Sequence, residues 1–302
     1  MEKMIITGAS GFVGTALAKR FTASGYQVTG IGTSRSHPTL AANTGFTWIS
    51  SDTTQPGTWQ ETIQQADVII NLTGRNIFHY WTEAYKQAIY DSRVLTTRHI
   101  TDAMAENKAQ LLLNASAVGI YGDCGETDLT ESSPHGHGFL ADVCRDWEAE
   151  ALKAGDKGAR VAVMRFGVVL GPGGGALSKM LPAFKLFAGG PLGGGRHWFP
   201  WIHIDDLANA ASYLMAHDQL QGVFNFTGPE PVRQGRFAKA LGRCLSRPSF
   251  MPAPAFMIRM VMGELGASLL QSQKASPENL LNAGFSFEFP TVDSALADIL
   301  KK

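Results

Sequence analysis

Hydrophobic and polar residues alternate with two different periods along the first two thirds of the chain. Short apolar runs rich in β-branched residues predict strands, and longer segments with apolar residues three and four positions apart predict helices. The predicted strands are 4–7, 26–32, 46–50, 67–73, 110–116 and 160–167. The predicted helices are 12–24, 58–65, 82–107 and 138–154. The last three strands are almost continuously apolar, as strands covered on both faces are, so the alternation predicts an α/β fold with a doubly wound parallel sheet.

The rest of the chain has a different character. Runs at 201–204 and 222–228 could extend the same sheet, whereas the other segments are glycine-rich or helical with proline-rich joints. We expect these other segments to form a smaller C-terminal lobe over the end of the sheet, and clefts between lobes are common ligand sites. The predicted division is a nucleotide-binding domain of residues 1–170, joined by about 200–228, and a substrate-side lobe of residues 171–199 and 229–302.

Composition and charge narrow the classes of partner. The formal net charge is zero and 17% of the residues are charged, which gives no electrostatic argument for nucleic acid or an anionic membrane. The three cysteines form no C-x-x-C pair, and this indicates a reducing compartment. The apolar run 255–262 is short and contains Arg259, so it cannot span a bilayer. With no signal-peptide pattern at the start, we expect a soluble cytoplasmic protein with a small-molecule substrate, and an oligomer is possible.

The turn after the first strand has the features of a phosphate-binding loop. It follows a strand and opens a helix, which is the context that a glycine fingerprint requires. Glycines permit a tight turn and a close backbone approach, and the helix N-terminus offers free N–H groups to a pyrophosphate. The alternative is a glycine-rich turn without a ligand. The residues expected to contact the cofactor here are Gly8, Ser10, Gly11, Phe12, Val13 and Gly14.

The end of the second strand predicts which nucleotide binds. It reads Gly32-Thr33-Ser34-Arg35, and no acidic residue lies between 29 and 51. An NAD-selective site usually has an acid here for the ribose 2′-hydroxyl, whereas an arginine suits a 2′-phosphate. The sequence therefore favours NADP(H), with contacts from Thr33, Ser34 and Arg35. The alternative for Arg35 is a solvated loop arginine.

The spacing G-x-x-G-x-x-G of the first turn resembles the short-chain dehydrogenase superfamily, in its extended, epimerase-like branch. The resemblance implies further cofactor contacts. Asp52, after the third strand, resembles the adenine contact, and Arg93 lies in a segment similar to the Asn-Val-x-Gly-Thr helix segment of extended members. The segment 71–74 resembles the backbone that passes the phosphates and ribose, which implies contacts from Leu72, Thr73 and Gly74.

A more particular resemblance extends over nearly the whole chain. The segments that carry it are 81–93, 115–123, 144–148, 165–175 and 201–206, the last containing the late His-x-Asp-Asp of extended members. Together they resemble one atypical family, the epimerase-family or sugar-nucleotide-epimerase-like proteins, which have a family-specific C-terminal domain. The resemblance implies a Rossmann-like fold and NADP(H) as cofactor. It implies no particular substrate.

The tyrosine and lysine that carry out the superfamily's chemistry are missing. In that chemistry a tyrosine acts as acid and base on the substrate hydroxyl, and a lysine four residues later lowers its pKa. None of the six tyrosines here has a lysine four residues after it, and the two places hold Leu140 and Cys144. Leucine has no proton to exchange, and a thiol in an apolar stripe has a raised pKa. We therefore expect the helix 138–154 to be a dry wall of the nicotinamide pocket without a part in proton transfer.

Ser116, Tyr121, Lys86 and His203 are the candidates for the remaining chemistry. Ser116 ends an apolar strand, where the resemblance places the catalytic Ser or Thr, and it is also expected to contact the cofactor; the alternative is a hydroxyl bonded to backbone. Tyr121 follows in the next loop and would need a nearby cation, such as Lys86 or Arg93. The alternative for Lys86 is a solvated helix residue. His203 could titrate near neutrality, and its alternative is a hydrogen-bonded structural histidine.

These features lead to two functional hypotheses. The first is an NADP-dependent oxidoreductase or epimerase of atypical chemistry, acting on an unidentified hydroxyl or carbonyl that could belong to a nucleotide-sugar-like molecule. The alternative is a non-catalytic NADP(H)-binding redox sensor or partner-binding protein. The surviving Ser116 favours the first, and the lost tyrosine and lysine favour the second. No metal is expected, because His135 and His137 lack a third ligand at metal spacing.

Overall fold

A seven-stranded parallel sheet forms the centre of the molecule. The computed structural model describes residues 2–41, 45–106 and 108–301. The strand order is β10-β7-β5-β4-β1-β2-β3, and all neighbouring pairs are parallel. The strands are β1 (Lys3–Thr7), β2 (Gln27–Gly32), β3 (Phe46–Ser50), β4 (Val68–Asn71), β5 (Leu111–Ala117), β7 (Arg160–Phe166) and β10 (Gly222–Phe226). The chain runs outward from β1 to β3 and then returns to β4 on the other side, which confirms the predicted doubly wound α/β fold.

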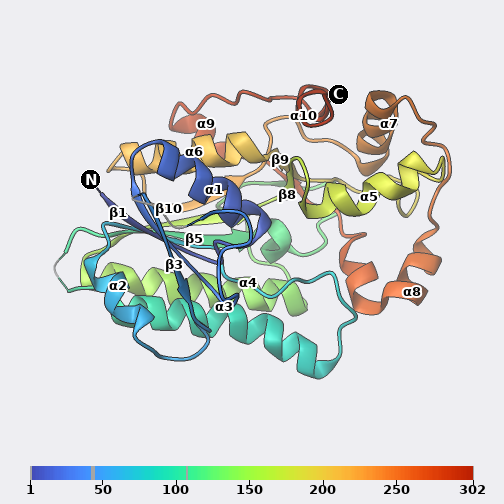
Figure 1. Ribbon diagram of the computed structural model, residues 1–302. Coiled ribbons are helices and arrows are strands. Elements are labelled where there is room, and N and C mark those ends of the chain that lie inside the picture. Colours follow the sequence, from blue (N-terminus) through green and yellow to red (C-terminus); the bar gives the residue numbers. More distant parts are fainter. Residues whose placement is uncertain (1, 42–44, 107, 302) are drawn as a thin grey trace.

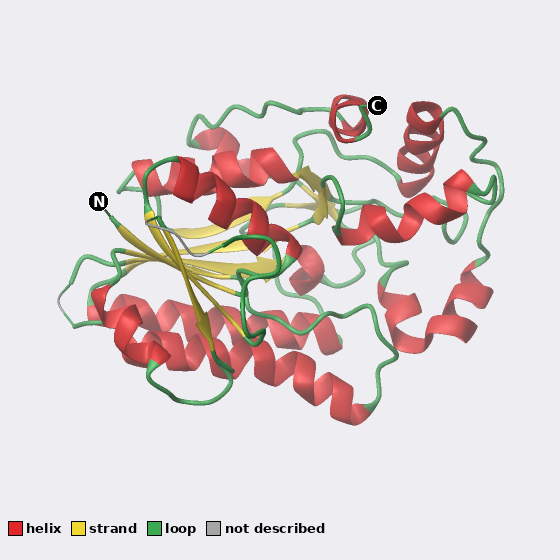
Figure 2. Ribbon diagram, viewed as in Figure 1, coloured by secondary structure: helices red, strands yellow, loops and turns green. Residues whose placement is uncertain are grey.

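Helices cover both faces of the sheet (Figure 1). One face carries α1 (Phe12–Ala23) and α6 (Ile204–Ala216). The other carries α2 (Trp59–Gln65), α3 (Glu83–Ala103) and α4 (Phe139–Leu152). Figure 2 shows the resulting three layers, with the strands in yellow between the helices in red.

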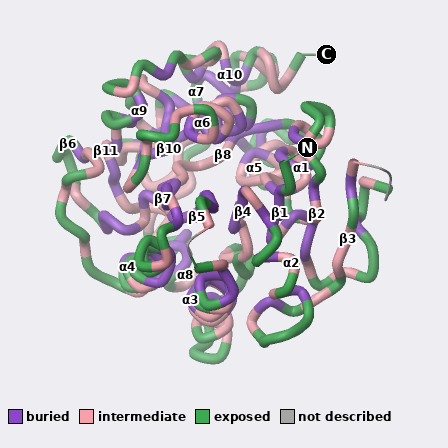
Figure 3. Tube along the Cα trace, turned by 90° about the vertical axis from the view of Figure 1, so that its left-hand side faces the viewer, coloured by how far each residue is buried: buried purple, intermediate pink, exposed green. Residues whose placement is uncertain are grey.

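Successive side chains of the strands are buried on opposite faces. Ile6 and Ile70 belong to the core cluster that includes α1 and α6, whereas Ile5 and Ile69 belong to the cluster that includes α2 and α3. Figure 3 shows the strands between α6 on one side and α3 and α4 on the other. Because both faces are covered, most side chains on either face are apolar, and this explains the nearly continuous apolar runs in the sequence.

A smaller C-terminal portion gathers at the right of Figure 1. There α5 (Gly175–Lys185), α7 (Gln234–Leu245) and α10 (Val292–Ile299) share one core cluster with β8 (Val168–Leu170) and β9 (Trp201–His203). Helix α8 (Ala255–Ser268) packs through Leu265 on Trp81 and Ile89. None of the helices in the described ranges is long and apolar enough to cross a membrane. The remaining elements are η1 (Val118–Tyr121), β6 (Asp128–Leu129), η2 (Lys153–Lys157), β11 (Lys274–Ala275) and α9 (Glu278–Asn282).

The prediction that 201–204 could extend the central sheet is wrong. Its strand β9 pairs with β8 in a separate two-stranded sheet. The reason lies at Gly167, whose amide donates to Phe226 of β10, while the next amide, that of Val168, donates to Pro200. The chain therefore leaves the central sheet after β7, and β10 takes the edge position. The predicted helix 82–107 begins as expected, with Thr82 as its cap, but ends at Ala103; residue 107 lies outside the described residues.

Candidate functional site

The turn between β1 and α1 has a backbone that only glycine fits at two positions. Gly8 has a φ of 67°, and a Cβ there would lie 2.7 Å from the carbonyl oxygen of Leu72. A Cβ at Gly14 would lie 2.3 Å from the carbonyl oxygen of Gly8. The helix that follows has Gly11 as its N-cap and no side chain caps it. The first N–H groups of α1 are therefore available to an anion, which the positive end of the helix dipole also favours.

Two cavities meet at this turn. The larger has a volume of about 530 Å³ and the smaller about 460 Å³, and both are bordered by Gly8, Gly11, Leu72, Gly74 and Arg75. They lie beside the neighbouring strands β1 and β4, between which the order of the strands reverses. Doubly wound folds bind their ligands at this point. The predicted cofactor residues that border one or both cavities are Gly8, Ser10, Gly11, Phe12, Val13, Gly14, Thr33, Asp52, Leu72, Thr73, Gly74, Arg93 and Ser116.

The other two predicted cofactor residues, Ser34 and Arg35, border neither cavity. Ser34 donates its hydroxyl hydrogen to the carbonyl oxygen of Ser36, and its own carbonyl accepts from the indole of Trp48. Arg35 is exposed in the same loop and forms no ion pair with a described residue. Its role toward a 2′-phosphate stays a prediction.

Arg93 is a cation at the border of the larger cavity that has no carboxylate partner in the described part of the chain. Its guanidinium lies beneath the 71–74 segment, since a Cβ at Gly74 would stand 2.9 Å from its Cζ. Nη1 donates to the carbonyl oxygens of Arg75 and Ile89, and the group lies 5.3 Å from the ring centre of Trp147. Burial lowers the pKa of Arg93. Arg93 is half-buried and has no acid beside it, so this position is suited to an anionic ligand.

Helix α4 forms a wall of the larger cavity with Leu140, Val143, Cys144 and Trp147. Burial raises the pKa of the Cys144 thiol to about 11, and the negative charge of Glu148 acts in the same direction. The thiol is therefore protonated at neutral pH. Leu140 and Cys144, which the sequence resemblance puts at the places of the superfamily's tyrosine and lysine, thus present an apolar side chain and a protonated thiol to the cavity.

Ser116 belongs to a buried network that the sequence did not reveal. It lies near the end of β5 at the border of the larger cavity, and its hydroxyl donates to Glu148 Oε1 at 2.6 Å. Glu148 is on α4, one turn after Cys144, and is only 4% exposed. Arg165 of β7 donates from Nε to Oε1 and from Nη2 to Oε2, both at 2.8 Å. Such a two-point, charge-assisted pair satisfies both buried charges.

Tyr121 lies away from both cavities. It is completely buried after β5, and its hydroxyl donates to Asn225 Oδ1 at 2.7 Å and accepts from Arg165 Nη1 at 2.9 Å. Burial raises the pKa of Tyr121. A tyrosine that replaces the missing acid and base would need a lowered pKa and access to the substrate, and this position provides neither.

Lys86, on α3, is also bound to other protein groups. The Lys86 ammonium donates to Glu264 at 2.7 Å and to Glu83 at 3.1 Å, and so joins α3 to α8. These hydrogen bonds, the one to Glu264 first, raise the pKa of Lys86. Lys86 borders neither cavity, and the structure gives it a role in holding two helices together.

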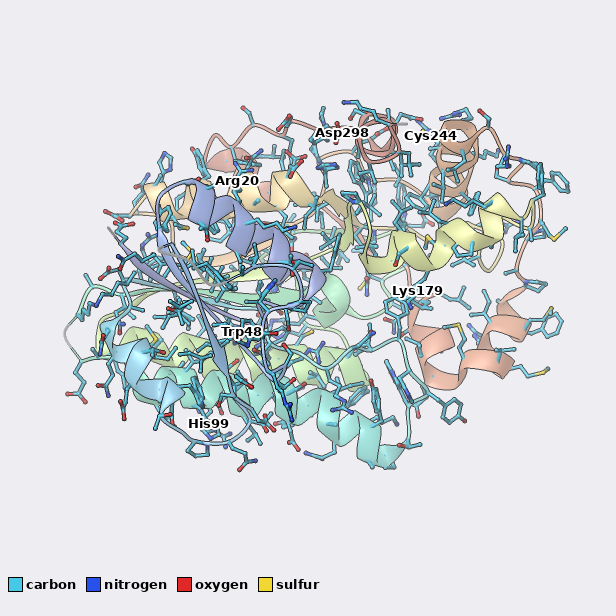
Figure 4. The ribbon with its side chains drawn as sticks, viewed as in Figure 1. Arg20, Trp48, His99, Lys179, Cys244 and Asp298 are labelled. Carbon is cyan, nitrogen blue, oxygen red and sulfur yellow. The ribbon has the colours of Figure 1, made fainter. Side chains whose placement is uncertain are left out.

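His203 ends β9 and caps α6. Its Nδ1 accepts the backbone N–H of Asp205 at 3.1 Å, its ring packs on Phe289 with ring centres 3.9 Å apart, and burial lowers its pKa. His203, Asp205 and Asp298, the last labelled on α10 in Figure 4, form a group close enough to hold a metal ion. However, an Nδ1 that accepts leaves Nε2 with the hydrogen, so neither nitrogen is free to bind a metal. We assign His203 a structural role and no metal.

The opposite wall of the larger cavity was not predicted residue by residue. It comes from the loop before β9, with His197 and Trp198, and from the segment after α8, with Gln271 and Gln273. Burial lowers the pKa of His197, and its Nε2 has no hydrogen-bond partner among the described residues. The sequence placed the glycine-rich segment before β9 on the substrate side, but nothing in it indicated that residues near 197 and 271 meet.

Comparisons with known proteins agree with this architecture. The model of the NAD-dependent epimerase/dehydratase family matches residues 4–226, and that of a domain of unknown function, DUF1731, matches residues 253–299. The chain is 38% identical over 301 residues to the epimerase family protein SDR39U1 homolog, chloroplastic, of Arabidopsis thaliana, covering 98% of this chain and 86% of that protein.

Solved structures show the same fold. The crystal structure of human epimerase family protein SDR39U1 with NADPH has a TM-score of 0.86 and 32% identity, covering 99% of both chains. The structure of MoeE5 with UDP-glucuronic acid and NAD has a TM-score of 0.78 at 17% identity, covering 99% of this chain and 98% of that one; this likeness shows the fold alone. The chain therefore belongs to the NAD-dependent epimerase/dehydratase family of extended short-chain dehydrogenases, in the group of SDR39U1-like epimerase family proteins that carry a DUF1731 segment at the C-terminal end.

Proposed function

We propose that this chain binds NADP(H) and acts as an atypical short-chain dehydrogenase, an oxidoreductase or epimerase for a hydroxyl or carbonyl of a small molecule. The observation that carries the proposal is the pair of cavities that meet at the glycine turn, with Ser116 at the border of the larger one. The NADPH in the structure of the human relative supports the choice of cofactor.

The residues around the turn fit the dinucleotide. The uncapped N-terminus of α1 would hold its pyrophosphate, and Asp52 and Thr33 border the smaller cavity where its adenosine would lie. Arg35 would reach the 2′-phosphate, and Arg93 offers a charge to a phosphate near Gly74. When bound, the cofactor supplies a nicotinamide that gives or takes a hydride.

The chain's own residues would bind the substrate and exclude water from it, and they would not supply a strong acid or base. Ser116 would hold the reacting oxygen of the substrate, and Leu140, Val143 and Cys144 keep that wall of the cavity apolar. We do not extend the proposal to Tyr121, Lys86 or His203, because each is bound to other protein groups away from the cavity. In the proposed arrangement the segments 171–199 and 229–302 form the substrate-side lobe, and the protein is cytoplasmic.

One observation favours the alternative, a non-catalytic NADP(H)-binding protein. The titratable side chains at the border of the larger cavity, among the described residues, are Arg75, Arg93, Cys144 and His197. Burial lowers the pKa of His197 and raises that of Cys144. Neither is poised to exchange protons with a substrate in the way that the superfamily's tyrosine does.

A cofactor titration followed by a turnover screen separates the two functions. NADPH and NADH binding would be measured by fluorescence, and a panel of alcohols and carbonyl compounds would then be tested for a change in reduced-cofactor absorbance. Turnover by any panel member that is lost in Ser116→Ala supports the enzyme. Tight NADPH binding without any turnover supports the binding protein, and no binding of either nucleotide refutes both.

A further inference from the structure

The direction of one hydrogen bond determines what Ser116 can offer to a ligand. Its hydroxyl has one hydrogen, and Glu148 Oε1 lies 2.6 Å from its oxygen. Glu148 is held at both carboxylate oxygens by Arg165, whose guanidinium stays charged in proteins. A carboxylate can only accept hydrogen bonds, so the Ser116 hydrogen must point to Glu148. Ser116 is 2% exposed at the border of the cavity, and its hydroxyl oxygen keeps only its lone pairs for a ligand.

Glu148 is not free to turn away. Arg165 is 2% exposed and also donates to the Tyr121 hydroxyl and the carbonyl oxygen of Glu131. Moving the Glu148 carboxylate would leave a buried guanidinium without its acid, which is strongly unfavourable. The network thus fixes the Ser116 hydroxyl in one orientation before any ligand arrives.

The charge around the larger cavity limits the ligand further. In the described ranges no Asp, Glu or Lys borders it, and its two arginines, Arg75 and Arg93, belong to the side near the glycine turn. The part of the lining that includes Trp198, Leu269 and Gln273 forms a wall that carries no formal charge at neutral pH. A ligand with its own phosphates or carboxylate would find no cation on that wall.

We propose that Glu148 is a positioning residue that binds the hydroxyl hydrogen of Ser116, so that Ser116 receives a hydrogen bond from an uncharged, largely apolar alcohol and discriminates against the corresponding ketone. This rests on the proposed function, because it names the class of substrate for the same cavity. Glu148 touches neither the ligand nor the cofactor in this role. It acts only through the direction of the Ser116 hydrogen bond.

Two probes with the same number of carbon atoms test the direction of the hydrogen bond between Ser116 and its ligand. Cumyl alcohol is tertiary and cannot lose a hydride, and propiophenone cannot be reduced by an oxidised cofactor, so neither reacts in the presence of saturating NADP⁺. Their dissociation constants would be measured by calorimetry on the full chain. The wild type should bind the alcohol about fivefold more tightly, since one hydrogen bond contributes about 1 kcal/mol.

Three variants test whether the ratio of the two dissociation constants depends on Ser116 and Glu148. Ser116→Ala should bring the two dissociation constants together. Glu148→Gln should narrow the ratio, because it replaces the charged acceptor of the Ser116 hydrogen by a neutral amide that holds this hydrogen less strongly. Glu150→Gln is the matched control, because Glu150 lies on the same helix and is paired with Arg98 and Lys153 but borders neither cavity. That control should keep the wild-type ratio.

Several outcomes would overturn the inference. Equal or tighter binding of the ketone by the wild type, a ratio unchanged in Ser116→Ala, or binding of neither probe while NADP⁺ is bound would each do so and leave the proposed function intact. If Glu148→Gln does not fold, the wild type and Ser116→Ala still decide the matter. Failure to bind NADP⁺ at all would refute the proposed function itself.

Discussion

Replacing Arg93 by methionine separates the function of this cation from its contribution to stability. The change removes the charge and two hydrogen bonds to backbone carbonyls, and it keeps a long side chain against Trp147. In the protein without cofactor, losing those bonds costs about 1 kcal/mol each, and losing the contact with the indole ring costs about 0.5–1 kcal/mol. Against this, Arg93 is a half-buried cation without an acid, and the variant no longer has the penalty of that partial desolvation.

The two contributions should nearly cancel. We therefore expect the free energy of unfolding of Arg93→Met, measured with urea and without cofactor, to stay within about 2 kcal/mol of the wild type or to exceed it. Affinity for NADPH should behave differently. Losing a charge-assisted hydrogen bond to an anion costs about 1.5–3 kcal/mol, which is roughly a ten- to hundredfold increase in the dissociation constant.

The measurement is a fluorescence titration with NADPH beside a urea unfolding curve. Arg98→Met is the control, because Arg98 lies on the same helix but pairs with Glu150 outside both cavities, so its NADPH affinity should not change. Wild-type affinity in Arg93→Met would refute the assignment of Arg93 to an anion. A loss of stability of more than about 4 kcal/mol with little change in affinity would mean that its role is structural.

Four further predictions test other parts of the protein. NADPH should bind at least about tenfold more tightly than NADH, a difference of roughly 1.4 kcal/mol, and Arg35→Ala should remove that preference; equal affinities in the wild type would contradict it. Gly11→Val should abolish NADPH binding, because the added side chain would stand where the pyrophosphate approaches the backbone. Circular dichroism should still show a fold, because a Cβ at position 11 meets only one carbonyl oxygen, at 3.2 Å. If a substrate is found, Cys144→Ala should keep turnover within a few-fold, whereas Ser116→Ala should cost about 1–3 kcal/mol in kcat/KM; the reverse order would make Cys144 the reacting group. Burial lowers the pKa of His203, so the unfolded chain takes up a proton near pH 6.5 that the folded chain does not; stability should fall as the pH drops below about 6.5, and less so in His203→Gln.

The fold could be predicted because its signals are local. The strand expected at 110–116 is β5 at Leu111–Ala117, and the glycine turn lies between β1 and α1 as expected. Each depends on residues that are neighbours in the sequence. The strand β9 was assigned to the wrong sheet because its apolar pattern is the same in either sheet. Its partner was decided by Gly167 and β10, which are far away in the chain.

The sequence predicted those parts of the candidate site that one continuous segment forms, such as the glycine turn. Residue type alone suggested Tyr121, Lys86 and His203, but the structure shows that each already has a protein partner: Arg165, Glu264 and the backbone of Asp205. A side chain held in this way has a different pKa and no access to a ligand. Sequence reveals which groups can do chemistry, and it does not reveal which of them are already bonded.

The sequence did not predict the hydrogen-bond network around Ser116, because its residues come from three separate segments. Ser116 is on β5, Glu148 on α4 and Arg165 on β7. The available signal was a charged residue on the apolar stripe of a helix, one turn beyond Cys144. A carboxylate in that position must find a cation, because a buried carboxylate without one would be too costly. Sequence could therefore have predicted a partner for Glu148 without identifying it.

The predicted replacement of the superfamily's tyrosine and lysine by Leu140 and Cys144 is consistent with the charges around these positions. Cys144 stands within the electrostatic range of Arg93 on one side and Glu148 on the other. A lysine at 144 would bring a second cation beside Arg93, and it would compete with Arg165 for Glu148. The cation near this wall is Arg93 of α3, and the hydroxyl of Ser116 is oriented by the carboxylate of Glu148. We therefore expect that a tyrosine at 140 and a lysine at 144 would not by themselves introduce the superfamily's usual chemistry, because the charges around position 144 suit a neutral residue.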